Sequence, residues 1–212
     1  MIIVNFKAYR EAQGEKAREI SKKCRKAAEE TGEEVIVCPS PQDTRPINEE
    51  GPETFSQHID PVKPGSHTGS VTAEGMKGAG VSGTLLNHSE KRIEREEIKA
   101  SIELCQEHNL TTVVCAQTPE ECSQLSKLEP DYIAFEPPEL IGGDTSVSEA
   151  KPELIEKAVR SSSVPLLTGA GIKTREDVEK SIEHGCKGVL VASGVVKADD
   201  VYEEVKDLCQ GL

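Results

Sequence analysis

Short apolar runs and charged, helix-like stretches alternate along the whole chain. The apolar runs are rich in Val, Ile and Leu, and a loop and a charged helical stretch follow each of them. Such runs are typical of parallel strands that are buried on both faces. The run at 54–59 is the most polar. The predicted strands cover residues 1–6, 34–38, 54–59, 83–87, 111–116, 132–136, 164–168 and 187–192.

The intervening stretches have the spacing of amphipathic helices. We expect helices over 15–30, 95–108, 149–160, 175–184 and 199–209, with a short one around 43–50. No linker or change of composition separates the eight strand-then-helix units. The 212 residues are enough for one sizeable core and too few for two comfortable domains, so we expect one domain over 1–212.

Alternating strands and helices predict a parallel sheet with crossover helices. Eight units in one domain favour closure into a barrel over an open, doubly wound sheet. No Gly-x-Gly-x-x-Gly motif follows the first strand, which argues against a dinucleotide-binding fold. The predicted fold is therefore a single (β/α)8 barrel of the α/β class, near the small end of the range of roughly 200 to 400 residues.

Charge and hydropathy exclude several classes of partner. The formal net charge of −13 argues against nucleic acid, because binding its phosphates needs a basic surface. No stretch approaches the roughly 20 apolar residues that span a bilayer, and 1–7 is too short for a signal peptide. We expect a cytoplasmic protein with no membrane partner. An anionic substrate would need a locally positive pocket in this acidic chain.

The seven cysteines show neither a C-x-x-C motif nor the spacing of a Cys/His metal site. Reduced, mostly buried thiols are the simplest interpretation. No metal and no cofactor are expected. With three Phe, three Tyr and no Trp, the core must be built from Val, Ile, Leu, Ala and Cys.

Polar residues follow several predicted strands. In a (β/α)8 barrel the carboxyl ends of the strands form the active-site rim. Asn5 and Lys7 end the first strand, His88 and Glu90 follow the fourth, and Glu136 follows the sixth. Each has an ordinary interpretation alone, as a solvated loop residue or a turn cap. Their convergence on one rim favours a catalytic site.

Two turns rich in small residues follow the seventh and eighth strands, at 168–171 and 192–194. Small residues let backbone N–H groups approach a phosphate, and a following helix adds the positive end of its dipole. A phosphate site at these two loops is a recurring feature of such barrels. The turns alone are equally compatible with ordinary strand-to-helix connections.

Three motifs together resemble the triosephosphate isomerase family over the whole chain. They are Asn5-x-Lys7, the segment His88-Ser89-Glu90-Lys91-Arg92, and Glu136-Pro137-Pro138-Glu139-Leu140-Ile141-Gly142. The short length and the form of the last motif resemble the archaeal branch. Asn-x-Lys alone would be a weak signal, whereas the other two motifs are specific in combination.

The resemblance implies a role for each matching residue. Glu136 is the base that removes a proton from the carbon next to the carbonyl, and His88, as a neutral imidazole, donates a hydrogen bond to the carbonyl oxygen. Lys7 supplies positive charge, oriented by Glu90, and Asn5 polarises substrate oxygens. The substrate, a phosphorylated triose, is contacted by Asn5, Phe6, Lys7, Ile141, Gly142, Gly171, Ala192 and Ser193.

The resemblance also implies a lid over 137–148, with a stiff Pro-Pro hinge and a Gly-Gly tip. The family usually has Ile-Gly-Thr-Gly where this chain has Ile141-Gly142-Gly143-Asp144. A carboxylate beside a phosphate would be repulsive, so we predict that Asp144 points outward. The segment 65–69 resembles the family's docking loop, in which Thr68 would approach the partner's site. A homodimer or homotetramer is therefore expected.

Two other functions remain open from the sequence. The barrel could be an aldolase in which Lys7 forms a Schiff base, although pairing with Glu90 would keep that lysine charged. It could also be an inactive barrel that only binds a phosphorylated ligand, which the altered lid tip favours and the retained Asn5, Lys7, His88 and Glu136 oppose.

Overall fold

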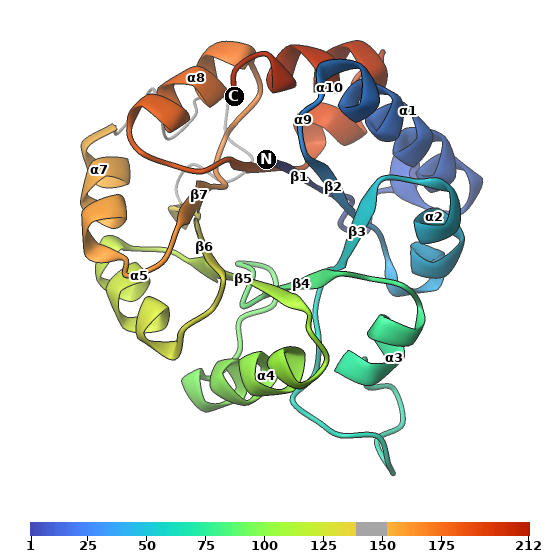
Figure 1. The fold of residues 1–212 in the computed structure, drawn as a ribbon, viewed down its shortest axis with the longest axis vertical. Coiled ribbons are helices and arrows are strands. Elements are labelled where there is room, and N and C mark those ends of the chain that lie inside the picture. Colours follow the sequence, from blue (N-terminus) through green and yellow to red (C-terminus); the bar gives the residue numbers. More distant parts are fainter. Residues whose placement is uncertain (139–151) are drawn as a thin grey trace.

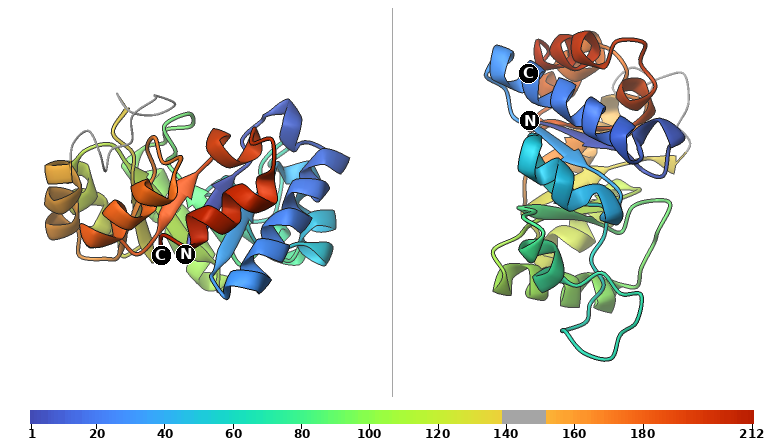
Figure 2. Two further views of the ribbon diagram at one scale, coloured as in Figure 1. Left: turned by 90° about the horizontal axis from the view of Figure 1, so that it is seen from above. Right: turned by 90° about the vertical axis from the view of Figure 1, so that its right-hand side faces the viewer.

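A computed structural model describes residues 1–138 and 152–212. Eight parallel strands form a closed barrel in which each strand pairs with its sequence neighbours and β8 pairs with β1 (Figure 1). Helices surround the barrel, and both termini lie on one of its ends (Figure 2). The predicted single (β/α)8 barrel is confirmed.

The strands are short and lie close to the predicted bounds. They are β1 Ile2–Asn5, β2 Val35–Cys38, β3 Glu53–Ser56, β4 Gly83–Leu86, β5 Thr111–Ala116, β6 Tyr132–Phe135, β7 Leu166–Thr168 and β8 Val189–Val191. β3 ends three residues before its predicted end. The Ser56 hydroxyl donates to the carbonyl of His58 at 2.7 Å, and this local turn takes the chain out of the sheet.

The described helices and 3-10 turns lie outside the strands (Figure 1). They are η1 Arg10–Ala12, α1 Glu15–Thr31, η2 Pro41–Asp43, α2 Thr44–Glu50, α3 Ala73–Gly78, α4 Arg95–Glu107, α5 Pro119–Leu125, η3 Ser126–Leu128, α7 Pro152–Ser161, α8 Arg175–Glu183, α9 Ser193–Val196 and α10 Val201–Cys209. No bounds were predicted for α3, α5 or α9. Thr72 and Thr118 cap α3 and α5 by accepting backbone N–H groups, a signal that could have located both.

Alternating strand residues build two separate apolar layers, because successive side chains point to opposite faces of a strand. One layer fills the barrel interior, and the other lies between the barrel and its helices. The interior layer consists of Ile3, Ile36, Cys38, Phe55, Leu85, Val113, Cys115, Ala134, Leu167 and Leu190. The barrel is thus a packed core that leaves room for a ligand only above the strand ends.

Candidate active site

A cavity opens at the carboxyl ends of β1, β4, β6, β7 and β8. The closed barrel brings together side chains that are more than a hundred residues apart in the sequence. The residues lining the cavity are Asn5, Lys7, Tyr9, His88, Glu136, Gly169, Gly171, Ile172, Lys173, Leu190, Val191, Ala192, Ser193 and Gly194.

Glu136 immediately follows β6 and is fixed by its backbone, whose N–H donates to the carbonyl of Ala116 at 2.8 Å. Only 3% of the residue is exposed. Its Oε1 lies 3.4 Å from Nε2 of His88. Its Oε2 is buried and has no hydrogen-bond partner among the described residues. An unpaired, desolvated carboxylate oxygen is a costly arrangement that is suited to taking a proton from a ligand.

The loop after β4 determines which ring nitrogen of His88 carries the proton. The backbone N–H of Glu90 donates to Nδ1 of His88 at 3.2 Å. A ring nitrogen that accepts a hydrogen bond carries no proton, so this contact selects the tautomer with the proton on Nε2. Oε2 of Glu90 lies farther from the same Nδ1, at 3.7 Å. That Nε2–H faces the cavity beside Glu136. The imidazole can therefore donate a hydrogen bond to a ligand oxygen without adding a charge.

Lys7 has left-handed backbone with φ of 47°, which is uncommon for a residue with a Cβ. Two side chains hold this turn: Oδ1 of Asn5 accepts the Lys7 N–H at 3.0 Å, and Nε2 of Gln57 donates to the Lys7 carbonyl at 2.9 Å. The ammonium of Lys7 donates to Oε1 of Glu90 at 2.9 Å.

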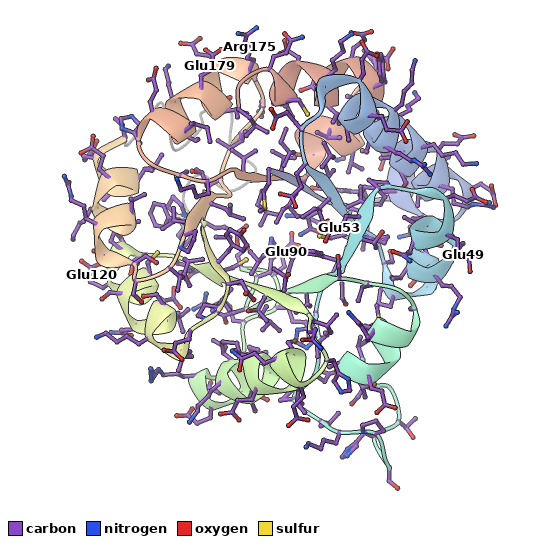
Figure 3. All side chains as sticks on the ribbon, viewed as in Figure 1. Glu49, Glu53, Glu90, Glu120, Arg175 and Glu179 are labelled. Atoms are coloured by element: carbon purple, nitrogen blue, oxygen red, sulfur yellow. The ribbon has the colours of Figure 1, made fainter. Side chains whose placement is uncertain are left out.

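Figure 3 shows Glu90 over the barrel, whereas Glu49, Glu120, Arg175 and Glu179 lie on outer helices.

The opposite side of the cavity is built from backbone. Gly171 has a φ of 72°, and Ala192 and Ser193 are the N-cap and first residue of α9. Lys173 lines the same side. Free N–H groups at a helix start together with a nearby cation are suited to an anion. The sequence placed only Lys7 at the rim, so Lys173 is a second cation that it missed.

Burial raises the pKa of the Cys115 thiol well above its usual value, and the neighbouring carboxylate of Glu136 raises it further. Cys115 belongs to the interior layer of the barrel, so it lies beneath the cavity. A thiol with such a pKa stays protonated and is a poor nucleophile. Cys115 therefore contributes to the packing around Glu136.

Comparison with known proteins agrees with this geometry. The family model described as triosephosphate isomerase matches residues 1–210. The chain belongs to the triosephosphate isomerase family. It is 42% identical over 184 residues to the triosephosphate isomerase of Methanothermus fervidus, covering 84% of this chain and 83% of the relative.

Two further archaeal relatives are similar to this chain to about the same degree. The triosephosphate isomerase of Methanocaldococcus jannaschii is 44% identical over 184 residues, which is 84% of each chain. That of Sulfolobus acidocaldarius is 44% identical over 183 residues, covering 84% of this chain and 80% of the relative. The similarity to archaeal members that the short length indicated is confirmed.

The family motifs fall on the cavity in most cases. Asn5, Lys7, His88, Glu136, Gly171, Ala192 and Ser193 all line it. Phe6 does not, since its side chain is fully buried in the outer apolar layer with Val4 and Ala12. Ile141, Gly142 and Asp144 lie outside the described residues, and so does most of the predicted lid.

A second cavity adjoins the first and shares Asn5, Lys7 and His88 with it. Its other walls come from Ala8, Pro41, Gln57, His58, Val71, Glu90 and Lys91. Asn5, Lys7 and His88 are therefore reached from two sides, whereas Glu136 lines the first cavity and not the second. Among residues 1–138 and 152–212, no helix is long and apolar enough to cross a membrane, and no cluster of three or more His, Cys, Asp or Glu could hold a metal.

Proposed function

We propose that the chain interconverts D-glyceraldehyde 3-phosphate and dihydroxyacetone phosphate in glycolysis and gluconeogenesis. The observation that carries this proposal is the pairing of two groups in one cavity. The buried Oε2 of Glu136, which has no hydrogen-bond partner within 1–138 and 152–212, supplies a base, and the Nε2–H of His88 supplies a neutral hydrogen-bond donor. These are the two groups that moving a proton next to a carbonyl requires.

The proposed reaction is a proton transfer through an enediolate. Glu136 removes a proton from the carbon next to the carbonyl, and the electron pair moves onto the carbonyl oxygen. His88 stabilises that oxygen through its Nε2–H, and the ammonium of Lys7 offsets the developing negative charge. The proton then returns from Glu136 to the former carbonyl carbon, and the proton of the original hydroxyl group moves to the former carbonyl oxygen as the new carbonyl forms. The atoms and protons of substrate and product are therefore the same, and the step draws on no cofactor.

The phosphate is proposed to lie across the cavity from Lys7. Gly171, Ala192 and Ser193 offer backbone N–H groups there, and Lys173 adds positive charge. The family motif adds Ile141 and Gly142 to this set. The two cations Lys7 and Lys173 provide the locally positive pocket that an anionic substrate needs in a protein with a net charge of −13.

The proposal is tested by assaying both directions of the isomerisation with the wild type, Glu136→Gln and His88→Ala. Turnover in the wild type that falls by about a thousandfold or more in Glu136→Gln supports it. Absent turnover with tight binding of a phosphorylated enediolate mimic would instead identify a binding protein. Borohydride trapping of Lys7 on substrate would identify the aldolase, in which the Lys7 amine would have to leave its ion pair with Glu90 to attack a carbonyl.

A homodimer or homotetramer is proposed from the loop between β3 and α3. It projects away from the barrel (Figure 1), and residues 63–70 are exposed. Thr68 would enter the second cavity of a partner, beside Asn5, Lys7 and His88. Thr68→Arg should dissociate the oligomer in sedimentation and lower kcat. An unchanged mass and kcat would contradict this assembly.

We also propose that residues 1–212 act as one catalytic domain in the cytoplasm. All seven cysteines are free and buried, as is usual in a reducing compartment. Fractionation of cells, with the activity recovered apart from membranes, tests the location.

A further inference from the structure

The loop that carries His88 begins with a residue to which neither the sequence nor the family motif gave a role. Asn87 follows β4 and has left-handed backbone with φ of 59°. It is 1% exposed, so its side-chain amide is removed from water. A buried amide must find hydrogen-bond partners, and here it finds two.

One partner closes the loop. Oδ1 of Asn87 accepts the backbone N–H of Ile93 at 3.2 Å. This bond joins the first and last residues of the segment 87–93, which contains His88 and Glu90. Within the segment, the N–H of Lys91 donates to the carbonyl of His88 at 2.8 Å. The segment is therefore a closed turn with the catalytic imidazole on it.

The other partner is on the next strand. Nδ2 of Asn87 donates to the carbonyl of Cys115 at 2.9 Å. β4 and β5 are neighbours (Figure 1), and Leu86 pairs with Val114, so Asn87 and Cys115 continue that register beyond the end of β4. Cys115 lies against Glu136 beneath the cavity. One amide thus links the turn carrying His88 to the strand that packs against Glu136.

A third contact braces the same turn from outside. A guanidinium nitrogen of Arg92 donates to the Asn87 carbonyl at 3.4 Å, and Arg92 is also paired with Glu121 on α5. Glu121 in turn accepts the backbone N–H of Gln117, just after β5, at 2.6 Å. The side chain and the carbonyl of Asn87 are therefore both anchored to the β5–α5 unit.

From these contacts we propose that Asn87 is a positioning residue that fixes the ring of His88 relative to Glu136. This proposal rests on the catalytic roles proposed above for His88 and Glu136. The left-handed φ alone does not require asparagine, since glycine adopts it freely. The two side-chain bonds do require asparagine, because they use one amide N–H and one amide oxygen in opposite directions.

The substitution Asn87→Gly separates these two requirements, because it keeps the backbone conformation and removes both bonds. A matched control exists in Asn109, which follows α4 at the opposite end of the barrel. Asn109 is also left-handed, with φ of 51°, but it is exposed. Asn109→Gly makes the same chemical change far from the cavity.

The experiment measures kcat, KM and melting temperature for the wild type, Asn87→Gly, Asn87→Asp and Asn109→Gly. Asn87→Asp keeps the acceptor for Ile93 but turns a carboxylate toward the Cys115 carbonyl. We expect both Asn87 variants to lose at least about tenfold in kcat with KM within about twofold, because a small misplacement of a catalytic group slows chemistry. Asn109→Gly should match the wild type.

A second readout separates positioning from simple destabilisation. The 15N NMR spectrum of His88 should show one tautomer in the wild type, with Nδ1 unprotonated, and a mixture in either folded Asn87 variant. A kcat within about twofold of the wild type in a folded variant, or a fall in kcat with an unchanged tautomer, overturns the proposal. His88→Ala serves as the reference: if it retains full activity, the proposed function fails rather than the role of Asn87.

Discussion

Gly169 lies directly against the side chain of Glu136. A Cβ placed on Gly169 would be 2.8 Å from Cγ of Glu136 and 3.1 Å from its Oε1. Such distances exclude any side chain at 169 unless the carboxylate moves. Gly169 belongs to the turn at 168–171 that is predicted to bind phosphate, and its small size also makes room for the proposed base.

Gly169→Ala should therefore displace the carboxylate and lower kcat by about a hundredfold, because catalysis depends on its placement. Steady-state kinetics measure kcat for the variant and the wild type. The affinity of the variant for phosphate should equal that of the wild type, which serves as an internal check. Gly78→Ala is the matched control, since a Cβ there meets nothing within 4 Å. Equal kcat for Gly169→Ala and the wild type would show that Glu136 tolerates displacement.

Glu90→Gln should lower kcat/KM by roughly three- to tenfold, because the Lys7 ammonium loses the partner that restricts its side-chain freedom. The melting temperature should hardly change, since Glu90 is 59% exposed and exposed ion pairs contribute little stability. Kinetics and thermal melts on one preparation check both. Glu120→Gln, which breaks the outer pair with Lys157, is the control and should leave kcat/KM unchanged.

The thiols should resist modification in the native protein. Burial raises the pKa of Cys24, Cys105 and Cys122 to about 12 and that of Cys186 to about 11. Titration with an aromatic disulfide should detect all seven thiols in denaturant and none rapidly at neutral pH. Rapid reaction of any thiol in the native state would contradict this packing.

Acid should weaken the fold through His58. Burial, and then the charge of Lys91, lower the pKa of His58, although Asp60 and Glu97 act in the opposite direction. The unfolded chain therefore binds more protons than the folded one below the ordinary His value of about 6.5. The contribution of the neutral His58 to the free energy of unfolding is therefore fully present above that pH, and it is lost as the pH falls below it.

The test compares melting temperatures at pH 7 and pH 5 for the wild type and His58→Gln. The decrease on acidification should be smaller in the variant by about 2–4 °C for each kcal/mol removed. His108→Gln, at the end of α4, is the control variant and should keep the wild-type decrease. Equal decreases in the wild type and His58→Gln would exclude His58 as the group responsible.

The barrel and most of its rim could be predicted because they follow from local patterns. Buried strands such as Thr111–Ala116 read as apolar runs, and closure of the barrel places their ends together. The contacts of Gly169, Lys173 and Asn87 could not be predicted in this way. Each of these contacts depends on a neighbour from another strand or on the direction of a side chain. The pattern of apolar and polar residues does not predict either of them.

The position of the Phe6 side chain could not be predicted from the family motif either. The predicted contact of Phe6 with the substrate stays a prediction, whereas the structure shows that alternation along β1 turns the side chain of Asn5 toward the cavity and that of Phe6 into the outer layer. The third strand was predicted to end at residue 59 rather than at Ser56, because the hydrogen bond from Ser56 to His58 that ends it is a local contact that the sequence pattern does not reveal.

The central claim is that Glu136 carries the transferred proton, and isotope exchange in D2O tests it most directly. The wild type should incorporate deuterium at the carbon next to the carbonyl of dihydroxyacetone phosphate, detected by NMR, while isomerisation proceeds. Glu136→Gln should bind the substrate and incorporate none on the same time scale. Deuterium incorporation by Glu136→Gln at the wild-type rate would show that another group is the base.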